Sequence, residues 1–104
     1  MNDAALSLLG LARRARRLSL GFDSVCDSVR KGEAQLVLTA DDLSDGSMKK
    51  LMRHTEGCST ELLKLPYAIE ELHAALGKAV GVISVNDSGF AKKIKLLLTG
   101  NGEE

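Results

Sequence analysis

The stretch Gln35–Ala40, with the sequence QLVLTA, limits the possible folds of this chain more than any other segment. Aliphatic and β-branched side chains follow one another there, whereas a strand with one wet face alternates apolar and polar residues. A strand with no polar face must be covered on both sides. The sequence therefore predicts a central strand of a sheet, with helices packed against each of its two faces.

Segments with helical periodicity alternate with this strand and with other short apolar runs. The predicted helices cover about 3–15, 22–31, 45–56, 68–76 and 88–98, and the predicted strands cover 18–20, 35–40, 60–65 and 80–85. Such alternation is typical of an α/β fold with three layers, α/β/α. We expect one sandwich domain over residues 1–99 and a flexible polar tail over residues 100–104.

The same periodicity predicts which side chains of the helices face the core. These side chains are Leu8, Leu11, Ala12 and Ala15 in the first helix, Met48, Leu51, Met52 and Thr55 in the third, and Phe90, Ile94, Leu97 and Leu98 in the last.

Composition excludes two ways of binding nucleic acid. Fourteen basic and fourteen acidic residues give zero formal net charge, which argues against binding a polyanion by bulk charge. Two phenylalanines, one tyrosine and no tryptophan are too few for a surface of aromatic rings that stack on bases. A local basic patch stays open, because residues 1–31 hold six basic and three acidic side chains while residues 32–76 hold four and eight.

The cysteines indicate a reducing compartment and no metal. Cys26 and Cys58 lie far apart in the sequence and belong to no CxxC or Cys/His cluster, so a zinc site is not expected. Two cysteines in a chain that can build its own core are typical of reduced, buried thiols. No apolar run approaches the length of a membrane span. We therefore expect a cytoplasmic protein without a cofactor or a membrane contact.

Catalytic motifs are absent from the sequence. It holds no GxxxxGK[ST], no GxGxxG after a strand and no GxSxG. Asp41 and Asp42 fit either a polar turn or a hydrolytic or metal-binding pair, and the turn is the commoner role of aspartate. Asp87 fits a helix N-cap better than part of a nucleophile loop. We therefore predict no catalytic residue and a protein that is not an enzyme.

Basic residues are concentrated before a glycine that opens a helix. Arg13, Arg14, Arg16 and Arg17 fall within five positions, and Gly21 precedes the second predicted helix. The unpaired amides and positive end of a helix, together with nearby arginines, form a phosphate-binding site. The alternative is that the arginines are only a solvated helix face.

Five segments in order resemble the ribosomal protein L7Ae/L30e superfamily, and in particular its bacterial YlxQ-type members. The segments are residues 8–16 (LLGLARRAR), 20–25 (LGFDSV), 32–42 (GEAQLVLTADD), 76–81 (LGKAVG) and 86–93 (NDSGFAKK). The resemblance covers nearly the whole chain. It implies an α/β/α sandwich of the L30e type, with a central mixed sheet of about four strands.

The resemblance also implies RNA binding at the start of the second helix. Members that bind kink-turn RNA carry Gly-x-Asn-Glu-x-x-Lys there, and the Asn, Glu and Lys contact the sheared G·A pairs and neighbouring groups. This chain has Gly21, Asp23, Ser24 and Asp27 at these positions, so only the glycine is retained. If the resemblance holds, basic residues between positions 13 and 17 and at three later positions supply the phosphate contacts. They are Arg13, Arg16, Arg17, Arg30, Lys31 and Lys78.

Two departures from the family pattern affect the function that is implied. Asp27 cannot donate a hydrogen bond when ionised and repels phosphate, and losing a good base contact costs about 1–3 kcal/mol. The apolar loop that covers a flipped-out base in family members is shortened after Gly81. We expect a protein that binds ribosomal or other structured RNA, associates with the ribosome, and has altered or weakened kink-turn recognition. The alternative is a protein-interaction module on the same fold that has lost RNA binding; the oligomeric state stays open.

Overall fold

The computed structural model describes residues 4–100, which form alternating helices and strands. The elements are α1 (Ala4–Arg14), β1 (Leu18–Leu20), α2 (Phe22–Arg30), β2 (Leu36–Thr39), α3 (Asp45–Thr55), β3 (Glu61–Lys64), α4 (Ile69–Leu76), β4 (Val82–Val85) and α5 (Ser88–Thr99). Every predicted element is present and lies within a few residues of its predicted bounds.

The strands form one mixed sheet in the order β1-β4-β2-β3. Strand β4 pairs antiparallel with β1 on one side and with β2 on the other, and β2 pairs parallel with β3. Strands β1, β2 and β3 therefore run in the same direction. As a result, their carboxyl ends lie at one edge of the sheet, together with the start of β4.

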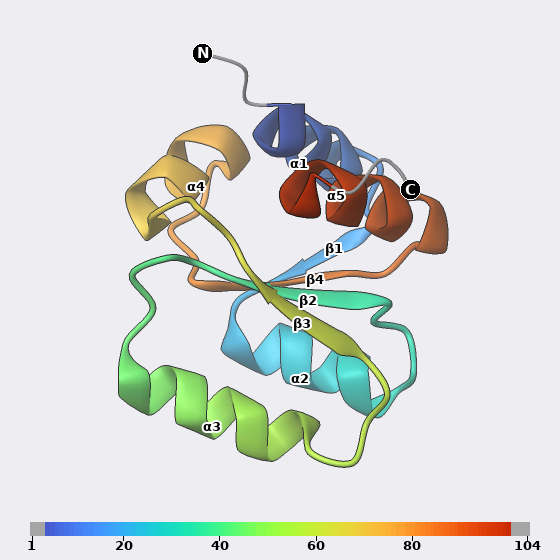
Figure 1. Ribbon diagram of the computed structural model, residues 1–104, viewed down its shortest axis with the longest axis vertical. Helices are drawn as coiled ribbons and strands as arrows, with labels where there is room; N and C mark the ends of the chain where they lie inside the picture. The colour runs from blue at the N-terminus through green and yellow to red at the C-terminus, as the bar shows by residue number, and fades with distance from the viewer. Residues whose placement is uncertain (1–3, 101–104) are drawn as a thin grey trace.

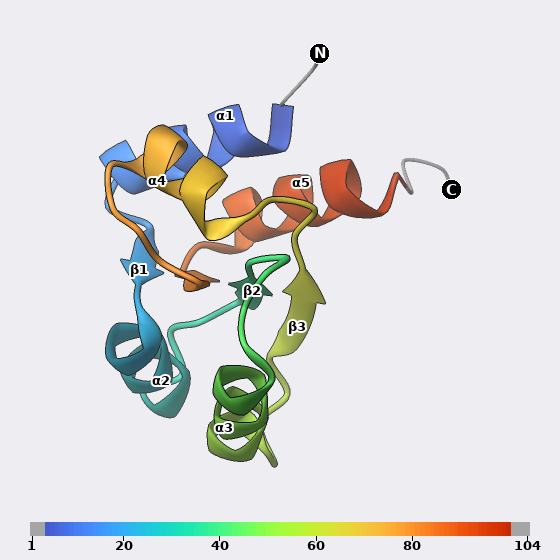
Figure 2. The same cartoon turned by 90° about the vertical axis from the view of Figure 1, so that its left-hand side faces the viewer.

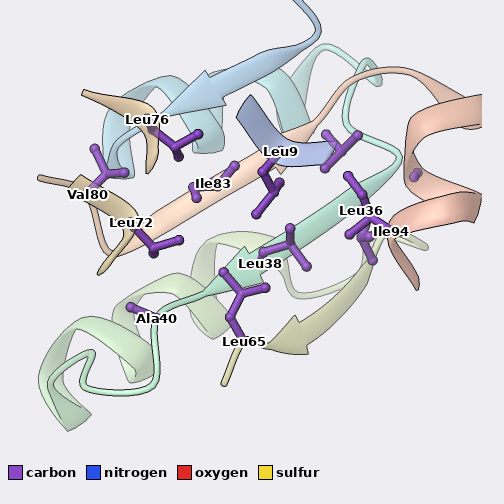
Figure 3. Close-up of a cluster of buried hydrophobic side chains, with 12 residues drawn as sticks. Leu9, Leu36, Leu38, Ala40, Leu65, Leu72, Leu76, Val80, Ile83 and Ile94 are labelled. Atoms are coloured by element: carbon purple, nitrogen blue, oxygen red, sulfur yellow. The ribbon is translucent and has the colours of Figure 1, made fainter. Parts of the chain in front are cut away.

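Helices cover both faces of the sheet, which confirms the predicted three-layer fold. Helices α1, α4 and α5 lie on one face and α2 and α3 on the other (Figures 1 and 2). All four side chains of β2 are buried, as its continuous apolar sequence predicts. Leu38 contributes to the cluster under α1, α4 and α5, which Figure 3 shows, and Val37 contributes to the cluster under α2 and α3.

Four side chains that were expected in the core are exposed, namely Leu11, Ala15, Met52 and Leu97. Leu11 is 49% exposed, Met52 57% and Leu97 45%. Helix α1 buries Ala12, as predicted, and it buries Ala5 and Leu9 in place of Leu11. The helical period fixed the spacing of the apolar residues but not the direction of the face. In α1 that direction is set by packing against α4 and α5, the two helices that it mainly touches.

The prediction that both thiols are buried is correct for Cys26 and wrong for Cys58. Cys26 is buried in α2, whereas Cys58 is exposed in the turn after α3, where its amide donates to the Thr55 carbonyl. Both are free, as expected. None of the helices within residues 4–100 is long and apolar enough to cross a membrane. The expected tail begins at Gly100, which caps α5 in a left-handed conformation, and its remaining residues, 101–104, lie outside the described part of the chain.

Candidate nucleic-acid interface

Gly21 forms the turn between β1 and α2 at the edge where the parallel strands end. Its backbone has φ 97° and ψ 157°, a conformation that side chains other than glycine rarely adopt. Its amide donates to the Val82 carbonyl at 2.9 Å, which places the start of α2 beside the start of β4. No atom outside the neighbouring residues lies within 4 Å of the position that a Cβ would take. The backbone at this turn is therefore open to a close approach.

The first turn of α2 presents polar groups to solvent at this edge. Gly21 has no side chain to cap the helix, so its first amides have no side-chain acceptor. Asp23 and Ser24 are exposed in that turn. The Asp23 carboxylate interacts favourably with the positive helix end, and it places a negative charge where a phosphate would otherwise bind. This arrangement favours hydrogen bonds to base edges over phosphate binding.

Asp27 is engaged by the two cations that follow it on α2. Its Oδ1 lies 2.7 Å from Arg30 Nη2 and its Oδ2 lies 3.1 Å from Lys31 Nζ. The hydrogen bond from Lys31, with the charges of Lys31 and Arg30, holds the pKa of Asp27 below its ordinary value. The same carboxylate raises the pKa of Lys31. Asp27 is therefore ionised and paired with Arg30 and Lys31. These ion pairs reduce the ability of both cations to bind phosphate.

The arginines of the first segment do not gather around Gly21. Arg13 donates from its guanidinium to the Leu76 carbonyl at the end of α4. Arg16 and Arg17 precede β1, whereas Gly21 follows it, so about 13 Å of extended chain separates Arg17 from Gly21. Helix α2 runs back alongside β1, with Ser19 Oγ and Ser28 Oγ 2.6 Å apart.

Arg30 and Lys31, at the end of α2, consequently lie toward the same end of the molecule as Arg16 and Arg17. Lys78 lies in the loop between α4 and β4, and that loop ends beside Gly21. The structure thus brings together Gly21, Asp23 and Ser24, with the loop of Lys78 next to them. It does not bring the expected arginines, or Lys31, to this group.

Sequence reasoning missed a cluster that α3 contributes to the start of α2. Lys50 Nζ lies 4.9 Å from the centroid of the Phe22 ring, and the His54 ring meets the same ring edge-on at 5.5 Å. Burial raises the pKa of the Cys26 thiol, the charge of Asp23 adds to this, and the charges of Arg30 and Lys50 oppose it. Only the topology could have predicted this cluster. Strands β1 and β2 run in the same direction, so the helices that follow them begin at the same edge of the sheet.

The candidate catalytic groups have structural roles. Asp42 accepts a hydrogen bond from the Ile69 amide at 2.9 Å, and Asp41 lies 3.7 Å from Lys64. Asp87 accepts from the Phe90 amide and so caps α5, as predicted. Within residues 4–100 no three histidine, cysteine or acidic side chains are placed to hold a metal ion. Asp41 and Asp42 therefore fit the turn better than the hydrolytic pair.

Comparison with protein families and curated proteins gives a consistent result. Residues 3–94 match the model of the ribosomal protein L7Ae/L30e/S12e/Gadd45 family. The RNA-binding protein YlxQ of Bacillus subtilis is 41% identical over 96 residues, which cover 88% of this chain and 91% of the relative. The RNA-binding protein YlxQ of Enterococcus faecium is 32% identical over 96 residues, with 92% of each chain covered. Both relatives are described as RNA-binding proteins.

Solved structures share the fold. A protein of unknown function from Bacillus halodurans aligns with a TM-score of 0.86 and 33% identity, over 94% of this chain and 99% of that protein. The 15.5 kD RNA-binding protein of Giardia lamblia aligns with a TM-score of 0.71 and 16% identity, over 96% and 89% of the two chains. At that identity the second likeness supports the fold alone.

The turn after α1 generates a stability prediction. Arg16 has φ 63°, the left-handed conformation in which a side chain is unfavourable. Glycine relieves this strain but also raises the conformational entropy of the unfolded chain, which opposes the gain. We therefore expect Arg16→Gly to raise the free energy of unfolding by a net amount of about 0.5–1 kcal/mol. Urea denaturation measures the change. Arg16→Ala is the matched control, because it removes the charge and keeps the strain; an equal gain in both variants contradicts the prediction.

Proposed function

Because this chain belongs to the ribosomal protein L7Ae/L30e/S12e/Gadd45 family, we propose that it is a non-catalytic protein that binds structured RNA. One observation carries the proposal: the first turn of α2 is exposed at an open glycine turn, in a chain 41% identical to a protein described as RNA-binding. The amides of this turn, Asp23 and Ser24 can all form hydrogen bonds to bases that lie against it.

The finer proposal is that kink-turn recognition is altered and weaker than in the family's kink-turn binders. Asp23 accepts hydrogen bonds, Ser24 can donate or accept, and Asp27 can only accept while it is ionised. The Asp27 charge is not isolated, because Arg30 and Lys31 pair with it. RNA binding at this position is therefore weakened mainly by the missing hydrogen-bond donor and by the ion pairs that engage Arg30 and Lys31. The RNA is ribosomal or another structured RNA, met in the cytoplasm or on the ribosome.

Fluorescence anisotropy with a kink-turn RNA and a plain duplex of equal length tests the proposal. Both titrations are run at low and at near-physiological salt. We expect the kink-turn RNA to bind more tightly than the duplex, by less than about 100-fold, and the preference to persist at the higher salt, because base contacts depend less on salt than phosphate contacts do. Equal, weak binding that disappears with salt contradicts recognition through α2. Absence of binding to either RNA contradicts the proposed function.

Asp27→Asn generates a second test of the same surface. The substitution removes a negative charge, restores a donor and releases Arg30 and Lys31 from their ion pairs. We expect RNA affinity to rise about 3- to 10-fold, because a donor replaces a charge that repels phosphate. We also expect a steeper dependence on salt, because Arg30 and Lys31 become free to meet phosphates of an RNA that extends along α2. Anisotropy at several salt concentrations measures both effects.

Glu61→Gln is the matched control for Asp27→Asn. It also removes one exposed carboxylate and breaks one ion pair, that with Lys95 Nζ at 2.7 Å, but it lies on β3 rather than on α2. We expect less than about a 2-fold change in affinity for this variant, since one remote surface charge is largely screened. An equal rise in both variants would show that net charge alone sets the affinity.

A second candidate function is a protein-interaction module on the same fold. It is favoured by a shallow, mainly apolar groove between α1 and α5 on the other helical layer. The exposed side chain of Leu11 and the partly buried side chains of Leu8 and Phe90 line this groove, together with Asp87 and Lys93. The two candidates separate in the RNA titration, because a chain that has become a protein-interaction module binds neither RNA.

A further inference from the structure

Helix α3 carries a basic face that takes part in no ion pair of the described structure. Lys49, Lys50 and Arg53 are all exposed. The ion pairs found among residues 4–100 engage Arg30, Lys31, Lys64 and Lys95 and leave these three side chains out. They therefore keep their full charge for an outside anion.

The position of α3 relative to α2 puts this face next to the candidate interface. Both helices cover the same face of the sheet and lie side by side (Figures 1 and 2). Both begin at the same edge, because β1 and β2 are each antiparallel to β4. The Lys50 ammonium lies over the Phe22 ring, and Phe22 stands between Gly21 and Asp23 in the chain. One cation of α3 is thus held directly beside the first turn of α2.

The spacing of the three side chains makes their face continuous. Lys49 and Arg53 are four residues apart and Lys50 and Arg53 are three apart, so each pair lies about 5–6 Å apart on the helix surface. His54 follows Lys50 at i+4 and extends the same side of the helix toward Phe22. The buried side of α3 is formed by Leu51, which is fully covered. The basic face therefore points away from the core, with Lys50 on the side next to α2.

We propose that Lys49, Lys50 and Arg53 form a phosphate-binding face, which contacts the backbone of the RNA whose bases lie against the first turn of α2. This inference rests on the proposed function. It follows from charge, because α2 presents Asp23 and Asp27, and the cations after Asp27 are paired with it. Lys50 then supplies the cation that position 27 lacks. Lys49 and Arg53 extend the binding face along the RNA strand.

Two double variants test the proposal with the same kink-turn RNA. Lys49→Gln with Lys50→Gln removes two adjacent charges from α3, and Lys92→Gln with Lys93→Gln removes two adjacent exposed charges from α5, in the other helical layer. We expect the α3 pair to weaken binding about 10-fold at near-physiological salt. We also expect its plot of log affinity against log salt to be shallower by about one to two units, one for each phosphate that is no longer neutralised. The α5 pair changes the affinity less than about 2-fold.

Two further variants separate a direct role in binding from a packing role. Lys50→Arg keeps the charge and the interaction with Phe22, so it retains the wild-type affinity within about 2-fold and the salt slope. The single variant Arg53→Gln weakens RNA binding by about 3-fold. Thermal denaturation of each variant checks that the fold is intact.

The outcomes decide between this proposal and the proposed function. If the α3 and α5 double variants lose affinity equally, the proposed basic face is overturned, because net charge alone then explains the binding. If the α3 double variant binds RNA as tightly as the wild-type chain does, the proposed basic face is overturned. RNA binding at the first turn of α2 then still stands. Absence of RNA binding by the wild-type chain overturns both.

Discussion

The antiparallel pairing of β4 with both β1 and β2 determines where the functional groups of this molecule lie. It makes β1 and β2 parallel to each other although they are not neighbours in the sheet. The helices that follow these strands consequently start at one edge. The turn at Gly21, the first turn of α2 and the loop that carries Lys78 meet there. Lys50 and His54 of α3 reach Phe22 at the same place. Local sequence supplies the groups, and this single pairing assembles them.

Charge pairing divides the basic residues into two classes. Arg30 and Lys31 are occupied by Asp27, Lys64 by Asp41 and Lys95 by Glu61. The basic face of α3 is not occupied in this way. A chain of zero net charge can bind RNA if several of its unpaired cations lie together on one surface. The distribution of pairing therefore matters more for RNA binding than the net charge does.

The sequence predicted the layers because β2 has no polar face and the helices have clear apolar periods. It failed for Leu11, Ala15, Met52 and Leu97, since the period does not say which neighbours a surface helix packs against. The run of arginines was placed near Gly21 because the two are close in sequence, yet a strand separates them. Lys50 was missed because the average charge of residues 32–76 is negative. Its importance depends on Phe22, 28 positions away, and only the paired strands bring the two together.

Chemical-shift mapping of the backbone amides during titration with a kink-turn RNA would locate the RNA on this molecule. We expect the largest changes at residues 21–24 and 49–54, with smaller changes near Lys78. Changes of this kind would place the RNA across the first turn of α2 and the second half of α3 beside it. Changes confined to α1 and α5, or spread evenly over every exposed lysine and arginine, would contradict the account.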